Sequence, residues 1–267
     1  DLEVTAERLR RVKLVILPHN PSLPDRAADE LIAYVRGGGK LLVFYVVPAP
    51  LRPVLGVEGG QHISAPQPGR FSAIRFAKDA LPGAPSVVAQ RSWNISVAKA
   101  VPGSSRVLAE WIDDQDQPTG YAAVVGSTNG LVMTHVMLPD DAANKRRMLL
   151  AMTGHLVPEL WRRAVEAGLE RLGTIGEFRS YGEAVEGIRR LAGGNARAVE
   201  ALAEAEESRE ASRKRAAEGR YAEALDAIVL ASDRLERAYC LAQRPLPGEF
   251  RAFWCHSAFG LADKDWD

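Results

Sequence analysis

Histidines and cysteines are the side chains that could give this chain nucleophilic, acid–base or metal-binding chemistry. The 267 residues contain seven of them: His19, His62, His135, His155, His256, Cys240 and Cys255. No histidine has a second histidine or cysteine at metal-ligand spacing within one element. Cys255 and His256 are adjacent, and neighbours on a strand point to opposite faces, so they are poorly placed to share an ion. With no phosphate loop or dinucleotide fingerprint either, the sequence predicts no metal and no cofactor.

Two polar clusters are candidates for a functional site. His19 and Asn20 follow the first predicted strand, at the carboxyl edge where open α/β sheets bind ligands. The alternative is that they are turn residues bonded to local backbone. Asp113, Asp114 and Asp116 could together hold a hard cation. A solvated hairpin tip explains the same acidic cluster without an ion.

Composition excludes several classes of protein. The chain has 34 Lys and Arg against 34 Asp and Glu, so no basic excess indicates nucleic acid as a partner. No apolar run approaches the ~18 residues of a membrane span, which predicts no membrane partner. Two cysteines are too few for a disulfide scaffold. The sequence starts without Met and reads as a piece of a longer protein, so a signal peptide would not be visible and no compartment is predicted.

The elements that would position these residues begin with a βαβ unit. Residues 13–17 form a short apolar run that predicts a strand, and residues 24–36 carry apolar side chains at helical spacing. Three glycines at 37–39 end that helix, and residues 41–47 form a second apolar run. Runs that are apolar on both faces indicate a buried parallel sheet.

Further strands and a change of composition follow. Residues 70–76, 87–89, 107–112, 121–125 and 131–136 predict short strands, and residues 113–118 and 126–130 predict hairpin turns. A helix over 140–156 closes the unit. Fourteen of the 16 prolines lie at or before Pro158, and helices are predicted over 159–172, 181–192, 195–218 and 221–243. We therefore expect an α/β domain over 1–158, a helical hairpin region over 159–244, and a new domain from 245 to 267.

The helical region has one clear apolar face. In the last predicted helix, apolar and aromatic residues recur on one side: Tyr221, Leu225, Ile228, Leu235 and Tyr239. The preceding helix has few large apolar residues beyond Leu202, so we expect its later part to be exposed.

The first part of the chain resembles a known family. The run LVILP at 14–18, the helix ending in three glycines, and LLV at 41–43 look like a class I glutamine amidotransferase-like domain. The variety concerned forms a middle domain in some β-galactosidases and other multidomain glycosidases. VLAEW at 107–111 through GLVMTH at 130–135 is similar to the end of that domain. The resemblance covers roughly residues 1–160 and implies a flavodoxin-like mixed sheet, with the family's first strand–helix units missing.

The resemblance also identifies missing chemistry. Active members use a cysteine thiolate at a strand-to-helix elbow, activated by a histidine. The elbow is expected after residues 41–43, where this chain reads FYVVP without cysteine, serine or threonine. Where the active family has glycines, this chain has His19, Asn20 and Pro21. His135 stands near the family's histidine position, but a base without a nucleophile transfers no acyl group, so no catalytic residue is assigned.

The end of the chain resembles a second family. EFRAFWCHSAFG at 249–260 and DWD at 265–267 look like the opening of a glycoside hydrolase family 10-like barrel. The resemblance implies Arg251, Trp254 and His256 as substrate-binding candidates; the alternative is that Trp254 packs the barrel floor and His256 bonds a neighbouring strand. Glycoside hydrolysis needs two carboxylates about 5–10 Å apart, and in a barrel they come from later strands.

Three hypotheses follow. The leading one is a non-catalytic accessory segment of a modular, bacterial-type glycoside hydrolase, with carbohydrate as its partner through the barrel. The first alternative is a helical module that binds another protein through residues 159–243. The second is a divergent amidotransferase-like hydrolase that uses His19 or His135. A homo-oligomer is compatible with each of them.

Overall fold

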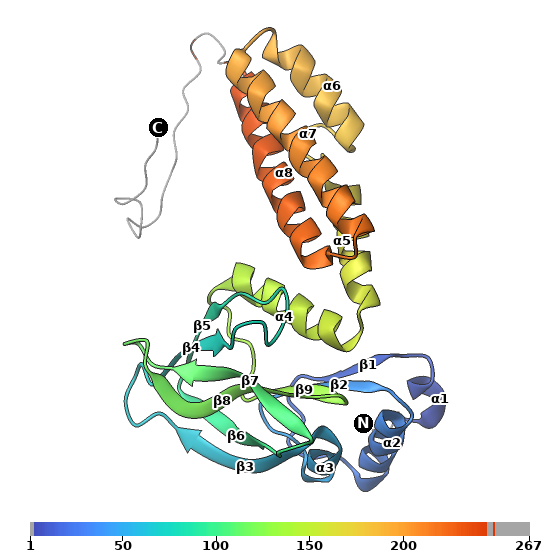
Figure 1. The fold of residues 1–267 in the computed structure, drawn as a ribbon, viewed down its shortest axis with the longest axis vertical. Helices are drawn as coiled ribbons and strands as arrows, with labels where there is room; N and C mark the ends of the chain where they lie inside the picture. Colours follow the sequence, from blue (N-terminus) through green and yellow to red (C-terminus); the bar gives the residue numbers. More distant parts are fainter. Residues whose placement is uncertain (1–2, 245–247, 249–267) are drawn as a thin grey trace. The chain divides into compact units, whose positions relative to one another are not determined.

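The computed structural model describes residues 3–244 and residue 248 (Figure 1). Contacts divide the chain into two compact units. The first contains the residues up to 169 together with 210–228, and the second contains 170–209 and the residues from 229 onward. The expected domains 1–158, 159–244 and 245–267 stay predictions, and the last of them falls almost wholly outside the described residues.

A seven-stranded mixed sheet forms the centre of the first unit, in the order β1-β2-β9-β8-β7-β4-β5. Its strands are β1 (Leu14–Leu17), β2 (Lys40–Phe44), β4 (Phe71–Phe76), β5 (Val87–Ser92), β7 (Ser105–Ile112), β8 (Pro118–Ser127) and β9 (Gly130–Met133). β1, β2 and β9 run parallel, and the other neighbours are antiparallel. This confirms the predicted α/β class with a mixed sheet.

The predicted βαβ unit is present as β1, α2 (Asp25–Arg36) and β2. Pro24 precedes α2 and Asp25 occupies its first turn, where a carboxylate interacts favourably with the helix dipole. Gly37 follows its last residue. β2, however, ends at Phe44 rather than at the predicted Val47.

A second sheet was not predicted from the sequence. It pairs β3 (Val57–Ser64) with β6 (Asn94–Ala100) in antiparallel fashion. Gly59 and Gly60 have φ values of 117° and 100°, and the register shifts between Gly59 and His62. Glycines inside a strand weaken the alternating pattern by which strands are recognised, so β3 reads as a loop.

Helices cover both faces of the large sheet (Figure 1). The short elements are α1 (Ala6–Leu9), η1 (Ala49–Leu51) and α3 (Arg52–Leu55), and α4 (Ala142–Leu156) is the predicted closing helix. Leu42 of β2 belongs to one buried cluster with Met148 of α4. Leu41 belongs to the other cluster, with Leu31 of α2. Alternate residues of β2 therefore build two cores, as expected of a strand buried on both faces.

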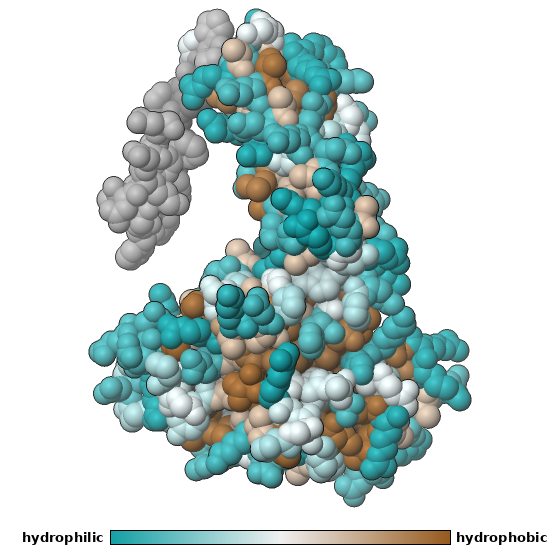
Figure 2. Space-filling model, viewed as in Figure 1, coloured by the Kyte–Doolittle hydropathy of each residue, from teal (hydrophilic) through white to brown (hydrophobic). Residues whose placement is uncertain are grey.

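The remaining helices lie where the sequence places them. They are α5 (Glu159–Arg171), α6 (Tyr181–Ala192), α7 (Ala196–Ala217) and α8 (Tyr221–Ala242). Figure 2 shows the visible face of these helices as mostly hydrophilic. Within the described part of the chain, no helix is both long and apolar enough to cross a membrane.

The expected exposure of α7 beyond Leu202 holds for one side of the helix only: Glu207 and Glu210 are exposed, but the opposite side is buried. Ala205 and Ser212 have no exposed surface, and Ser208 is 5% exposed. Small side chains allow close approach of a neighbouring helix, so one side of α7 is buried there without large apolar residues. Ser208 also accepts a hydrogen bond from the guanidinium of Arg234 in α8, which supports the helical hairpin.

The predicted apolar stripe of α8 is filled by other helices of the same units. Tyr221, Leu225 and Ile228 pack with Val165 of α5. Farther along, Leu235 joins a cluster formed with α6 and α7. The stripe therefore leaves no open groove for a partner helix.

Candidate functional site

A cluster of aromatic and imidazole rings lies where the three parallel strands end. His19 follows β1, Tyr45 follows β2, and His135 follows β9. The ring of Tyr45 has its centroid 5.2 Å from that of His19 and 5.2 Å from that of His135. His62 of β3 adds a third imidazole at 6.4 Å. The carboxyl edge of the parallel strands, where the sequence suggested a site, thus carries a ring cluster centred on Tyr45.

Tyr45 directly follows β2, at the position where the sequence resemblance predicts a strand-to-helix elbow. Its φ of 67° is left-handed, which costs a bulky residue free energy and occurs mostly where the surroundings enforce it. Its backbone N–H donates a 2.7 Å hydrogen bond to the carbonyl of Met133 in β9, which ties this residue to the end of the neighbouring strand. A left-handed turn with a tyrosine side chain therefore follows β2 directly.

The phenol of Tyr45 is held as a hydrogen-bond donor. Its hydroxyl donates to the Oδ1 atom of Asn94 in β6, at 2.9 Å. Burial raises the pKa of the Tyr45 phenol above its ordinary value of 10.0, because the phenolate would lose solvation. At neutral pH the group is a neutral phenol, which is a poor nucleophile.

His135 is the buried base of the cluster, with 2% of its surface exposed. Its Nδ1 atom lies 2.9 Å from the carbonyl oxygen of Val136, and the side-chain amide of Gln90 donates to the same oxygen at 2.6 Å. The geometry assigns the proton to Nδ1. Burial lowers the pKa of His135, and the positive charge of Lys145 lowers it further, against the opposing effect of the Val136 hydrogen bond. The imidazole is therefore neutral at pH 7.

Thr134 is the hydroxyl residue next to this base, and it is already engaged. Its Oγ1 atom donates to the carbonyl of Ala122 at 2.9 Å and accepts from the indole N–H of Trp111 at 2.8 Å. It has no exposed surface. A substrate could not reach this oxygen, so Thr134 does not replace the missing cysteine.

The other candidate residues named from the sequence do not join the ring cluster around Tyr45. Asn20 is half-buried beside His19 and makes no side-chain hydrogen bond within the described chain. Asp113 accepts hydrogen bonds from the backbone of Gln115 and Gln117, as a hairpin-tip residue does. No three His, Cys, Asp or Glu side chains among the described residues form a group that could hold a metal ion. Arg251, Trp254 and His256 lie outside the described residues, as does Cys255.

Sequence reasoning missed Tyr45, Asn94, His62 and Trp93 as members of the cluster. Trp93 packs edge-on against His135 with ring centroids 5.6 Å apart. Tyr45 had a usable signal, since it falls at the elbow position of the family that residues 1–160 resemble. His62, Trp93 and Asn94 had none, because β3 and β6 were not recognised as strands.

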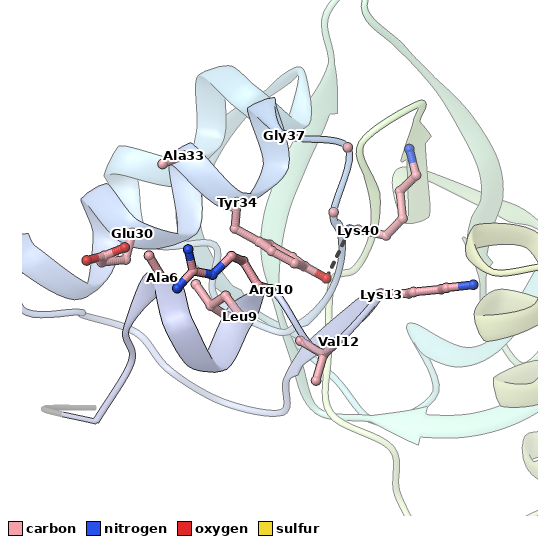
Figure 3. A pocket seen from close by; sticks show the side chains of 12 residues that line it. Ala6, Leu9, Arg10, Val12, Lys13, Glu30, Ala33, Tyr34, Gly37 and Lys40 are labelled. Atoms are coloured by element: carbon pink, nitrogen blue, oxygen red, sulfur yellow. Dashed lines mark hydrogen bonds between the residues drawn. The ribbon is translucent and has the colours of Figure 1, made fainter.

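A cavity also lies at the opposite end of the parallel strands. It has a volume of about 590 Å³ and lies between α1, α2 and the glycines at 37–39. Figure 3 shows the ring of Tyr34 crossing it toward Lys40. The ammonium groups on its rim are already engaged: Lys13 pairs with Glu159, and Lys40 donates to the carbonyl of Thr128. Arg10 and Glu30 also line the cavity.

Acid should destabilise the fold through His135. Its pKa is below the ordinary 6.5 in the folded chain, so the unfolded chain takes up the proton first as the pH falls. Stability is then fully present above about pH 6.5 and decreases below it, until the folded imidazole also titrates. We expect His135→Gln to lose less unfolding free energy than the wild type between pH 8 and pH 5, in urea titrations. His155, whose pKa burial and Arg106 also lower, stays in both proteins. Equal losses would contradict the expectation.

Comparison with known proteins gives likenesses of fold only. No family model matches the chain, and no curated protein matches its sequence. A β-galactosidase from Bacillus circulans sp. alkalophilus is similar with a TM-score of 0.42 and 17% identity, over 55% of this chain and 23% of that one. The N-terminal domain of mmIFT52 is similar with a TM-score of 0.44 and 12% identity, over 58% of this chain and 81% of that domain's chain. A GMP synthase-like protein from Thermoplasma acidophilum is similar with a TM-score of 0.36 and 14% identity, over 61% of this chain and 80% of that one.

The chain thus spans less than a quarter of the β-galactosidase that it matches. Likenesses at these identities and TM-scores assign no function to the chain.

Proposed function

We propose that this chain is a non-catalytic accessory segment of a modular glycoside hydrolase, in which it supports a family 10-like barrel. The observation that carries the proposal is Tyr45 at the elbow after β2. A domain that keeps the left-handed elbow, and fills it with a neutral phenol bonded to Asn94, retains a catalytic fold without the acyl-transfer nucleophile.

The neighbouring groups point the same way. His135 would have to take a proton from a nucleophile, and the hydroxyl beside it, that of Thr134, is buried and doubly hydrogen-bonded. Cys240, the cysteine that the structure describes, lies on α8 in the second unit. The resemblance of residues 1–160 to the middle domain of multidomain glycosidases supplies the glycosidase context.

The partners belong to the proposal as well. Carbohydrate would be bound and cleaved by the barrel, whose first residues would include Arg251, Trp254 and His256. Nucleic acid and membrane are not proposed as partners, and a homo-oligomer is compatible with an accessory role. The helical interaction module is less well supported, because α8 buries its apolar stripe against α5, α6 and α7.

A divergent hydrolase is the second candidate, and one observation favours it. Three imidazoles, from His19, His62 and His135, surround the hydroxyl-bearing ring of Tyr45. Such a cluster could move protons if a substrate supplied its own nucleophile or a water were bound. The following experiment separates this reading from the accessory role.

We expect the purified chain to release neither ammonia from glutamine nor nitrophenol from aryl glycosides, because Tyr45 and the buried Thr134 are the hydroxyl groups beside His135 in the described part of the chain, and the proposal assigns glycoside cleavage to the barrel. Tyr45→Phe removes the hydrogen bond to Asn94 and should lower the unfolding free energy by about 1 kcal/mol. Tyr45→Phe should, like the wild type, release neither ammonia nor nitrophenol. The longer polypeptide that carries this segment should cleave a glycoside.

Turnover by the chain alone that Tyr45→Phe or His135→Gln abolishes would overturn the accessory role in favour of the hydrolase. A longer polypeptide that cleaves none of the glycosides would remove the glycosidase context.

A further inference from the structure

A second cavity, of about 470 Å³, lies beside the exposed ring of Trp93, near the β4–β5 edge of the large sheet. Its volume falls in the range of about 300–1,000 Å³ that is typical of small-ligand pockets. The residues that matter are Gln67, Phe71, Arg91, Ser92, Trp93 and Asp114. They come from a loop, two strands, the link between two sheets, and a hairpin tip.

Trp93 forms a fixed aromatic platform at this cavity. It is the single residue between β5 of the large sheet and β6 of the small one, and 63% of its surface is exposed. Its carbonyl accepts a 2.8 Å hydrogen bond from the N–H of Ala65, and its ring packs on His135. The left-handed backbone of Arg91, with φ of 44°, turns the chain just before it. An exposed indole held this firmly is already ordered for a ligand.

The polar groups around the platform have no partners within the described chain. The Oγ atom of Ser92 is buried and makes no hydrogen bond, and the residue is only 5% exposed. The side chains of Arg91 and Asp114 form no ion pair or hydrogen bond with described residues, and Gln67 is equally unengaged. The side chains of Arg91, Asp114 and Gln67 therefore keep hydrogen-bonding capacity that a ligand in the cavity can use.

The acidic member is held in place by its backbone. The N–H of Asp114 donates to the carbonyl of Gly69 at 2.9 Å, which ties the hairpin tip to the loop at the cavity. A Cβ atom on Gly69 would lie 2.3 Å from the Oδ2 atom of Asp114, so the carboxylate sits directly over this glycine. Loop and hairpin together therefore fix the position of the carboxylate at the rim.

We propose that the cavity beside Trp93 binds a neutral saccharide, with a pyranose ring stacked on the indole. A pyranose has an apolar C–H face for the ring and a rim of hydroxyls that both donate and accept. Asp114 accepts, Arg91 donates, and the side-chain amide of Gln67 can do either. One positive and one negative side chain cancel, which favours an uncharged ligand. The choice of a saccharide rests on the proposed function, whereas the pocket itself does not.

The test is calorimetric titration of the full chain with cellotetraose, xylotetraose, mannotetraose and galactotetraose, and with adenosine as a flat heteroaromatic ligand. We expect at least one tetrasaccharide to bind with a Kd on the order of 1 mM or below. Trp93→Ala should weaken that binding by at least about tenfold, since stacking is lost over an exposed platform. Trp93→Phe should retain part of it, and Asp114→Asn should weaken it without altering the fold.

Val107→Ala is the matched control, because Val107 is an exposed apolar residue of the same unit, at 46%, away from the cavity. It should bind as the wild type does. Binding of no tetrasaccharide, equal binding by Trp93→Ala, or binding of adenosine alone would overturn the inference. Saccharide binding by a chain whose longer polypeptide cleaves no glycoside would leave this inference standing and remove the proposed function. Glycoside cleavage by the longer polypeptide, without saccharide binding at the cavity beside Trp93, would overturn this inference and leave the proposed function standing.

Discussion

Replacing Trp111 with alanine is expected to lower the free energy of unfolding of the α/β unit by about 3–5 kcal/mol. Trp111 lies in β7 with no exposed surface and is the largest fully buried side chain in the described chain. Its ring meets that of Phe71 edge to face at 5.7 Å. Truncation opens a cavity among neighbours that the sheet holds in place, so the site can collapse only partly.

The indole N–H adds to this cost. It donates to the Oγ1 atom of Thr134 at 2.8 Å, and the ring lies 6.5 Å from that of His135. Trp111 therefore holds Thr134, the residue that precedes the buried His135. Loss of the indole should admit water next to His135, which would reduce the burial that lowers its pKa.

Two variants serve as controls for the Trp111 prediction. Trp111→Phe keeps an aromatic ring but removes the hydrogen bond and part of the volume, so we expect a loss of about 1–2 kcal/mol. Trp93→Ala removes an exposed tryptophan of the same unit and should change stability by about 0.5 kcal/mol or less. Hydrogen exchange of the β7 and β8 amides measures the unfolding of this unit separately from the second unit. A loss below about 1 kcal/mol for Trp111→Ala would contradict the expectation.

Local pattern was sufficient where an element is long or continuously apolar. The apolar runs of β1 and β2, and the Pro24 and Gly37 boundaries of α2, predict the βαβ unit closely. The polar tip at Asp113 likewise predicts the β7–β8 hairpin. In each case, neighbouring residues in the sequence contain the physical cause of the structure.

Features that depend on distant residues could not be predicted. Tyr45 has a left-handed backbone and donates its N–H to the carbonyl of Met133 in β9, and no property of a tyrosine indicates either feature. His19 and His135 were each suspected alone, but only the parallel pairing of β1, β2 and β9 brings them to one ring. The cavity beside Trp93 joins segments from residue 65 to residue 114 and has no local signature.

Gly130→Ala should be about as damaging as the loss of Trp111, although it adds only one methyl group. Gly130 opens β9 opposite Leu41 of β2. A Cβ atom there would lie 2.3 Å from the carbonyl oxygen of Leu41 and 2.8 Å from the Cδ2 atom of Leu55. The first of these is backbone of a central strand and cannot move without breaking the β2–β9 pairing. We expect a loss of about 3 kcal/mol of unfolding free energy.

Gly37→Ala is the matched control, since Gly37 has an ordinary φ of −78° and a Cβ there would meet nothing closer than 3.4 Å. It should stay within about 1 kcal/mol of the wild type. The same strand pairing holds Tyr45 in its left-handed turn, through the carbonyl of Met133. Gly130→Ala should therefore also reduce the protection of the Tyr45 amide against hydrogen exchange, whereas Trp93→Ala should not. If Gly130→Ala were as stable as Gly37→Ala, the parallel register of β2 and β9, and with it the elbow that defines the site, would be wrong.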